Sequence, residues 1–206
     1  MEKNPNLSGL LSHGTPMDKK VKYIGAISRM EIFPTKKKYN IVAVISGPEP
    51  QRTMLEKAFI GQAKKLPYIC LVIQGKPEED KRFFINKNIE VISCLTSEEL
   101  NRAILSSDLF VGRSGYSSIM DLAKLGKPAL FIPTPGQTEQ EYLAELYVRS
   151  GIFYAQKQND FNLKKGIKTA LERGGLDNVF FQNNKMKNAV RDFLASCHSF
   201  QNARLK

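Results

Sequence analysis

Little in this sequence points to a disulfide framework or a structural metal site. Its 206 residues include 3 cysteines and 2 histidines, and no cysteines stand in CxxC spacing. The odd number and wide separation of Cys70, Cys94 and Cys197 argue against disulfides and against zinc. Because Cys70 and Cys94 belong to apolar runs, we expect both to be buried thiols in a reducing compartment.

Long apolar stretches are also missing. No run of about 18 apolar residues occurs, and the amino terminus lacks the apolar core of a secretory signal. We therefore expect a cytoplasmic chain that does not span a membrane. Internal repeats are absent too, and 206 residues suit one domain of ordinary size with or without appendages.

The net charge of +11 is concentrated at the two ends of the chain. Residues 1–40 hold 8 basic and 3 acidic side chains, residues 41–156 hold 13 of each, and residues 157–206 hold 10 basic and 4 acidic. A nucleic-acid-binding domain usually carries its basic patch on the folded part. The neutral middle therefore argues against DNA or RNA as a partner.

Short apolar runs alternate with amphipathic segments through most of the chain. Strands are expected at 21–28, 39–46, 68–75, 88–94, 108–115, 128–133 and 152–155. Helices are expected at 51–66, 97–104, 116–125, 138–150, 162–174 and 185–197, with Thr96 or Ser97 capping the second. This alternation predicts an α/β fold, a Rossmann-like doubly wound parallel sheet.

Three parts follow from this pattern. Residues 1–40 form a leader with the first strand, residues 41–175 form the Rossmann-like domain, and residues 176–206 form a helical segment. In such a sheet, ligands bind beyond the carboxyl ends of the strands, where three turns are expected to meet.

The first turn, 46–51, reads Ser-Gly-Pro-Glu-Pro-Gln, and Gly47 allows the backbone to approach a ligand closely. It matches neither GxGxxG nor a P-loop, so a simple tight turn before a helix is the alternative. The third turn, 134–137, leads to Gln140 and Glu141, which could select a ligand rich in hydroxyl groups. Ordinary surface residues are the alternative for that pair.

The second turn carries the clearest signal. Small residues open a helix there, so that unpaired N–H groups and the helix dipole favour an anion. The residues concerned are Ser114, Gly115, Tyr116, Ser117 and Ser118. Asp121 falls on the same helical face as the serines, where its carboxylate could accept bonds from the vicinal hydroxyls of a ribose; a solvated acid is the alternative.

Other catalytic candidates are weak. His13 and His198 lie far apart in sequence without a nucleophile beside either, and no carboxylate pair has a glycosidase-like context. The sequence also lacks a DxD-like pair, so no metal site is expected.

Residues 113–145, RSGYSSIMDLAKLGKPALFIPTPGQTEQEYLAE, resemble the C-terminal, nucleotide-sugar-binding half of GT-B glycosyltransferases, in particular the family-28 group. The resemblance implies a UDP-sugar as donor substrate, no further cofactor, and transfer of a hexosyl group to an acceptor hydroxyl. Two departures stand out. The turn at 46–51 differs from the family's G-G-S-x-G-A, and Asp121 replaces its usual glutamate.

The resemblance also implies roles for individual residues. Asp121 would hold the ribose, Gly115 and Tyr116–Ser118 would meet the diphosphate, and Gln140 and Glu141 would select the donor sugar. Leu95 would line the uracil, and Arg29 would lie near the phosphates. Because family members carry an N-terminal acceptor domain, we expect that domain to be supplied in cis, by a longer chain, or in trans, by a second subunit. The resemblance also implies that the leader, residues 1–40, includes the interdomain linker.

Two other functions stay open from the sequence. One is a domain of a UDP-sugar 2-epimerase, which shares the two-domain architecture, and the other is a non-catalytic nucleotide-binding module. The basic ends further suggest peripheral contact with an anionic membrane face, which would place the protein at the inner face of the membrane.

Overall fold

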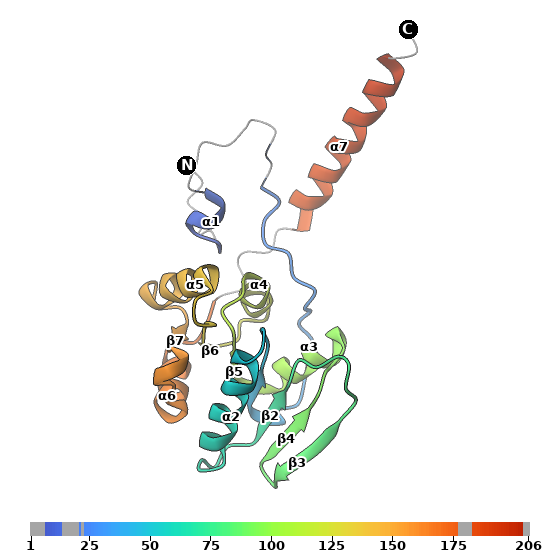
Figure 1. Ribbon diagram of the computed structural model, residues 1–206. Helices are drawn as coiled ribbons and strands as arrows, with labels where there is room; N and C mark the ends of the chain where they lie inside the picture. Colours follow the sequence, from blue (N-terminus) through green and yellow to red (C-terminus); the bar gives the residue numbers. More distant parts are fainter. Residues whose placement is uncertain (1–6, 14–20, 22, 177–182, 204–206) are drawn as a thin grey trace.

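A computed structural model describes residues 7–13, 21, 23–176 and 183–203 (Figure 1). Its centre is a seven-stranded sheet in the order β3-β4-β2-β1-β5-β6-β7. The strands are β1 (Tyr39–Val44), β2 (Cys70–Ile73), β3 (Arg82–Asn86), β4 (Ile89–Ile92), β5 (Ser107–Gly112), β6 (Ala129–Phe131) and β7 (Tyr154–Ala155). All neighbours are parallel except β3 and β4. The predicted α/β sheet is confirmed.

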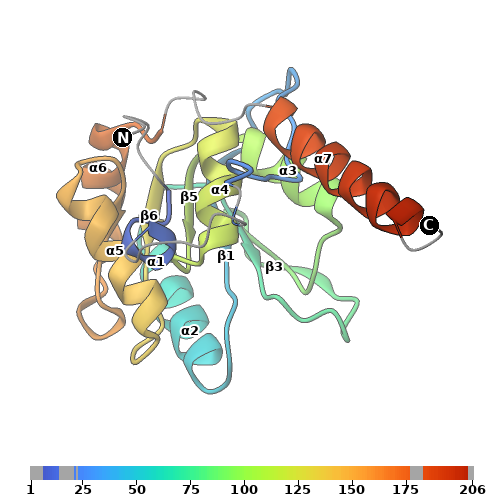
Figure 2. The same ribbon diagram turned by 90° about the horizontal axis from the view of Figure 1, so that it is seen from above.

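Helices cover both faces of the sheet. On one face, α2 (Gln51–Ala63) and α6 (Leu163–Arg173) pack onto the strands. On the other face lie α3 (Ser97–Leu105), α4 (Tyr116–Leu125) and α5 (Thr138–Arg149). Seen from above in Figure 2, α3 and α4 lie side by side, away from α2. Three further elements are the short α1 (Leu10–His13), the 3-10 turn η1 (Gln158–Asp160) and the long α7 (Asn183–Ala203).

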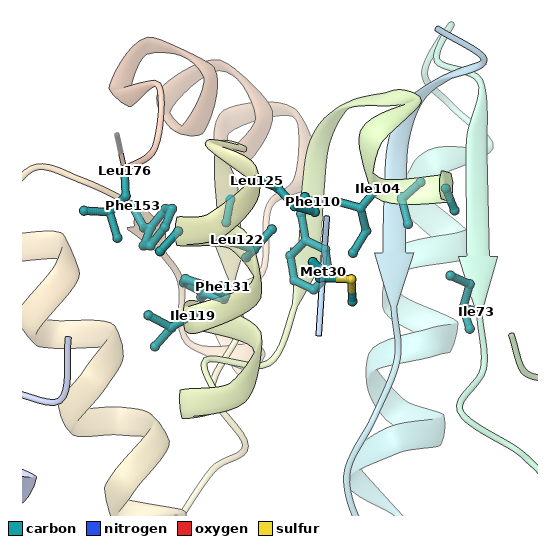
Figure 3. Packing of buried hydrophobic residues seen from close by; sticks show 14 of the residues in the cluster. Met30, Ile73, Ile104, Phe110, Ile119, Leu122, Leu125, Phe131, Phe153 and Leu176 are labelled. Atoms are coloured by element: carbon teal, nitrogen blue, oxygen red, sulfur yellow. The ribbon is translucent and has the colours of Figure 1, made fainter. Parts of the chain in front are cut away.

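The central strands are apolar throughout because successive side chains enter different layers. In β1, Ile41 and Ala43 pack with α2 and α6, whereas Val42 packs with the helices of the other face. Phe131 of β6 meets Phe153 at a centroid distance of 5.2 Å and an interplanar angle of 82° beneath α4 (Figure 3). Burial of such runs from both sides is what makes parallel strands read as continuous apolar stretches.

The predicted cap of α3 is also confirmed. Thr96 is the N-cap, and its side chain accepts a hydrogen bond from the backbone N–H of Glu99. The Glu99 carboxylate accepts in return from the backbone N–H of Thr96 over 2.9 Å. This reciprocal pair satisfies two donors at the start of the helix and fixes where it begins.

The prediction of a strand at 21–28 is wrong, since residues 21 and 23–28 are in neither strand nor helix. Its nearest strand in sequence, β1, is paired on both sides by β2 and β5, so no edge is open to it there. The segment is held by other contacts. Met30 is buried beside Phe110 (Figure 3), and Asn101 Nδ2 donates to the Glu31 carbonyl over 3.0 Å.

One strand was not predicted, and one cysteine is not where it was expected. Residues Arg82–Asn86 form β3, which joins β4 through a connection too short for a parallel crossover and is therefore antiparallel. Cys94 is exposed because it follows the end of β4, whereas Cys70 is buried within β2 as expected. The side chain of Cys197 lies outside the described residues.

The leader packs against α5. The hydroxyl of Tyr147 donates to the Leu7 carbonyl over 2.8 Å, and the N–H of Leu10 donates to the hydroxyl of Tyr142 over 2.7 Å. Leu7 is itself buried in the core cluster under α4 and α5. Part of the leader is thus attached to the same body as the sheet.

Candidate functional site

The chain changes direction across the sheet between β1 and β5. From β1 it proceeds outward through β2 to β4, then returns to the other side of β1 and continues through β5, β6 and β7. Such a switch point leaves a crevice at the carboxyl ends of the two neighbouring strands, where α/β sheets bind their ligands. The turns after β1, β5 and β6 end at this edge, as the sequence predicted.

Arg113 joins these three turns. Its guanidinium is buried and donates to four backbone carbonyls, those of Ser46 (3.2 Å), Gln51 (3.0 Å), Ile132 (2.9 Å) and Pro133 (3.2 Å). Within the described part of the chain, it forms no ion pair with a carboxylate. Burial lowers the pKa of Arg113 to about 10. A buried cation that has no carboxylate partner among the described residues therefore lies where the three turns meet.

Arg113 was not predicted as a site residue, although it stands directly before the Ser114–Gly115 turn. The signal that could have revealed it was an arginine placed at the very end of an apolar strand, where a surface residue is unexpected.

Gly47 and Thr134 show how closely the turns approach one another. A Cβ at Gly47 would lie 3.5 Å from Thr134 Oγ1 and 3.8 Å from Arg113 Nε, and Gly47 adopts a φ of 110°. Thr134 is buried, and its hydroxyl has no hydrogen-bond partner in the structure. Thr134 was not singled out from the sequence, and it adds an unpaired polar group to this convergence.

The amino end of α4 lies at the same edge. Gly115 is the N-cap, with φ −70° and ψ 146°, and no side chain caps the first turn. Ser117 is exposed, Ser118 is half-buried, and Tyr116 packs against the core cluster. An α-helix of 10 residues that begins without a side-chain cap offers its first N–H groups to an anion.

Ser114 and the start of α5 connect the second and third turns. The Ser114 hydroxyl donates to the Gln140 carbonyl over 2.7 Å. Gln140 Oε1 accepts from the Thr134 N–H over 2.9 Å, and Glu141 Oε1 accepts from the Gly136 N–H over 3.0 Å. Gln140 and Glu141 thus hold the turn at 134–137 through hydrogen bonds to its backbone, which ordinary surface residues would not do.

Asp121 lies further along α4 and is buried, so the alternative of a solvated acid is wrong. Ser28 Oγ donates to Asp121 Oδ1 over 2.6 Å, and Arg29 Nε lies 3.8 Å from Asp121 Oδ2. Burial raises the pKa of Asp121, although the Ser28 hydrogen bond and the Arg29 charge oppose the rise. Two predicted site residues, Arg29 and Asp121, therefore meet in space.

Arg29 also reaches the neighbouring helix. Its Nη1 donates to Ser97 Oγ over 3.1 Å at the start of α3, two residues after Leu95. Leu95 is half-buried against the core cluster. The predicted residues accordingly form two groups, one around Arg113 and Thr134 and one around the Arg29–Asp121 pair, with α4 common to both.

The described residues contain neither a metal-binding cluster nor a membrane-spanning helix. No group of three or more histidine, cysteine, aspartate or glutamate side chains in that part of the chain could hold a metal ion. None of the described helices is both long and apolar enough to cross a membrane.

The chain is similar, over part of its length, to several bacterial transferases that share one name. UDP-N-acetylglucosamine--N-acetylmuramyl-(pentapeptide) pyrophosphoryl-undecaprenol N-acetylglucosamine transferase from Flavobacterium psychrophilum is 37% identical over 62 residues, 30% of this chain and 16% of that protein. The protein of the same name from Lactococcus lactis subsp. cremoris (strain MG1363) is 32% identical over 88 residues, 42% of this chain and 21% of that protein. The chain therefore covers well under two thirds of these relatives.

Solved structures share the fold. The crystal structure of Acinetobacter baumannii MurG has a TM-score of 0.55 at 15% identity, covering 75% of this chain and 49% of that one. The glycosyltransferase of kitacinnamycin has a TM-score of 0.55 at 16% identity, covering 85% and 48%. The solution structure of ALG13, with a TM-score of 0.50 at 13% identity, covers 74% and 94%. These likenesses confirm the Rossmann-like sheet as the C-terminal half of a GT-B architecture.

The sequence matches the family described as "Glycosyltransferase family 28 C-terminal domain" over residues 44–198, which is most of the chain and includes all three turns. The resemblance expected from residues 113–145 is thereby confirmed. This chain belongs to the glycosyltransferase family 28 C-terminal domain family.

Proposed function

We propose that this chain binds a UDP-sugar at the switch-point crevice and serves as the donor half of a hexosyltransferase. The observation that carries the proposal is the uncapped amino end of α4 beside a buried arginine that has no carboxylate partner among the described residues. Both features supply positive potential where a diphosphate would lie. Family membership and the UDP-N-acetylglucosamine named for the relatives support the same donor class.

The proposed contacts divide along the donor molecule. Backbone N–H groups at Gly115 and Tyr116–Ser118 meet the diphosphate, with Gly47 allowing close approach from the turn after β1. Asp121 accepts from the ribose hydroxyls, since a carboxylate has more acceptor sites than the Ser28 hydroxyl occupies.

The remaining contacts lie at the two ends of the donor. Gln140 and Glu141 face the sugar, and Leu95 lines the uracil. Arg29 is assigned to the phosphates, and its Nε lies 3.8 Å from Asp121, the residue assigned to the adjoining ribose.

In the proposed reaction, an acceptor hydroxyl attacks the anomeric carbon of the donor. The new carbon–oxygen bond forms as the bond from that carbon to the phosphate oxygen breaks, and UDP leaves. The hydroxyl proton passes to a base on the acceptor domain. The N–H groups and dipole of α4 stabilise the charge that grows on the departing diphosphate, and no metal ion takes part.

A second domain completes the proposed enzyme. The solved glycosyltransferases of similar fold are about twice as long as the part this chain covers, since 48% and 49% of their chains align. We propose that an acceptor domain joins in cis or in trans, and that the chain alone binds nucleotide without turning over sugar. Nucleic acid is not among the proposed partners.

The proposed location is cytoplasmic and peripheral, with the basic chain ends against an anionic membrane. Flotation with anionic liposomes at low salt should recover the protein in the lipid fraction, and recovery should fall as salt is raised. Absence of the protein from the lipid fraction at low salt would show that this location is wrong.

Calorimetric titration with UDP tests the site. Asp121→Ala should weaken binding at least about tenfold, about 1.4 kcal/mol. Ser28→Ala is the matched control, because it removes the same contact to the linker but leaves the carboxylate in place. Unchanged affinity in Asp121→Ala, or equal losses in both variants, contradicts the ribose assignment.

The two alternative functions have their own tests. Incubation of the full-length protein with UDP-N-acetylglucosamine alone distinguishes transfer from 2-epimerisation, because only an epimerase forms a new sugar nucleotide without acceptor. Sugar transfer restored by adding the acceptor domain excludes a non-catalytic module.

A further inference from the structure

The edge of the sheet formed by β3 is unusually apolar for an exposed strand. Phe83 is 44% and Phe84 is 66% exposed, and in the described structure β3 pairs only with β4. The hairpin lies at the margin of the molecule in Figure 1, away from α5 and α6. An edge strand has a row of unpaired backbone donors and acceptors on its outer side, and it can accept a further strand.

A pocket opens beside this strand. It has a volume of about 310 Å³ and lies between the β3–β4 hairpin and the residues that begin β1 and β2. Ile69 and Phe84, both exposed, form apolar walls, while Lys38, Arg82 and Lys87 bring positive charge to its lining. The combination suits an apolar side chain with a carboxylate next to it.

The one carboxylate in the pocket is already engaged. Glu90 is buried and accepts from the Tyr39 hydroxyl over 2.8 Å and from Arg82 Nε over 2.6 Å. Lys38 Nζ lies 3.9 Å from Glu90 Oε2 at a largely exposed position. The lining thus holds one acid, Glu90, and three cations, Lys38, Arg82 and Lys87, so the pocket has an excess of positive charge.

We propose that β3 and this pocket bind an extended acidic segment of a partner protein, which adds to the sheet as a strand beside β3. Backbone hydrogen bonds from the outer edge of β3 supply pairing, and Phe84 contacts an apolar side chain of the added strand. Because β4 and β2 separate this edge from Ile69 and Lys38, the residues that follow the added strand pass the hairpin turn at Lys87 and enter the pocket, where Lys38 and Lys87 attract their carboxylates. A second copy of this chain is disfavoured, because it would bring Arg82 and Lys87 against the same cations.

This surface is separate from the nucleotide site. The pocket lies at the amino ends of β1 and β2, whereas the turns held by Arg113 lie at the carboxyl ends. Loss of peptide binding and loss of UDP binding can therefore be distinguished in one protein.

The test uses the full chain and a fluorescein-labelled peptide of alternating glutamate and valine, followed by fluorescence anisotropy. A peptide of alternating lysine and valine tests charge. The double variant Phe84→Ser/Lys87→Glu should lower affinity for the acidic peptide at least about tenfold. Lys164→Glu is the matched control, as an exposed lysine on α6 at the opposite edge of the sheet. All variants should keep UDP affinity.

Amide chemical shifts locate the peptide. Changes concentrated in β3 and at Lys38 support the proposal. Equal binding of the lysine peptide, equal affinity in the double variant, or shifts elsewhere overturn it. Binding of a single-stranded oligonucleotide without binding of the acidic peptide also overturns it, because the surface would then be a general polyanion site.

Discussion

The hydroxyl of Ser28 donates a 2.6 Å hydrogen bond to Asp121, 93 residues further along the chain. Together with Arg29 at 3.8 Å, this contact attaches the segment before β1 to the middle of α4. The carboxylate that we assign to the ribose therefore already orders a polypeptide segment. Under this assignment, nucleotide binding and the position of residues 28 and 29 should be coupled through one side chain.

Protonation of Asp121 should weaken UDP binding. Burial raises the pKa of this carboxyl above its ordinary value of 3.8, so affinity should begin to fall at a higher pH than for an exposed aspartate as pH is lowered. Titrations of UDP from about pH 7 to about pH 4 measure this fall. Asp121→Asn corrects for protonation of UDP itself. A wild-type protein that parallels Asp121→Asn would show that the carboxylate is not in contact with the ligand.

The same shift has the opposite consequence for stability. A carboxyl whose pKa is raised on folding contributes stability that is present below its unfolded pKa and is lost as pH rises through the folded pKa. Relative to Asp121→Asn, the wild type should therefore lose free energy of unfolding across the window just above 3.8. Urea denaturation at several pH values provides the measurement.

Replacing Arg113 should loosen the three turns. Arg113→Met leaves the carbonyls of Ile132 and Pro133 without their donor in a buried place, and should lower the free energy of unfolding by about 2–5 kcal/mol. Arg113→Lys retains the charge but not the fork, and should lose about 1–3 kcal/mol together with UDP affinity. Urea denaturation measures both, with Arg149→Lys at an exposed position as control. If Arg113→Met is no less stable than that control, Arg113 does not hold the turns.

Phe131 should be among the most sensitive core positions. It is fully buried between Phe110 and Phe153, and Phe131→Ala should cost about 3–5 kcal/mol through lost contacts and a remaining cavity. The exposed Phe84→Ala should change stability by less than about 0.5 kcal/mol. Thermal or urea unfolding of the pair checks the contrast. Similar effects at the two positions would conflict with the packing in Figure 3.

Glu90 should account for part of the loss of folding stability at low pH. Its burial raises its pKa, but hydrogen bonds from Tyr39 and Arg82 outweigh that effect and hold the pKa below its ordinary value of 4.5. Its contribution to stability is thus present above 4.5 and lost as pH falls through the folded pKa. The stability difference between wild type and Glu90→Gln should shrink on acidification. A difference independent of pH would mean that the ionised form makes no special contacts.

The strands of the central sheet could be predicted because their apolar runs admit few other structures. β1, β2, β4 and β6 lie inside the expected ranges, and β5 begins one residue before its range, at Ser107. β3 was not predicted as a strand, since an exposed edge lacks a buried face to impose a pattern. The prediction of a strand at 21–28 is wrong for a different reason. An apolar segment can join a sheet only where a strand has an unpaired edge, and β1 is paired on both sides.

The site could be predicted in outline but not in its internal contacts. The turn at Gly115 and the face of α4 that carries Asp121 follow from helix spacing alone. By contrast, the bonds from Arg113 to four carbonyls depend on which turns meet in space, and an arginine is normally expected at the surface. The assignment of individual residues to ligand groups stays a prediction.

The way Arg113 holds the turns bears on how donor preference can change. Its four acceptors are backbone carbonyls, which residues of every type provide. Side chains in the turns at 46–51 and 132–137 can therefore be exchanged while the spacing of the loops is retained. Loops exchanged at these two turns should therefore change the proposed preference for a sugar donor while the contacts of Arg113 are kept.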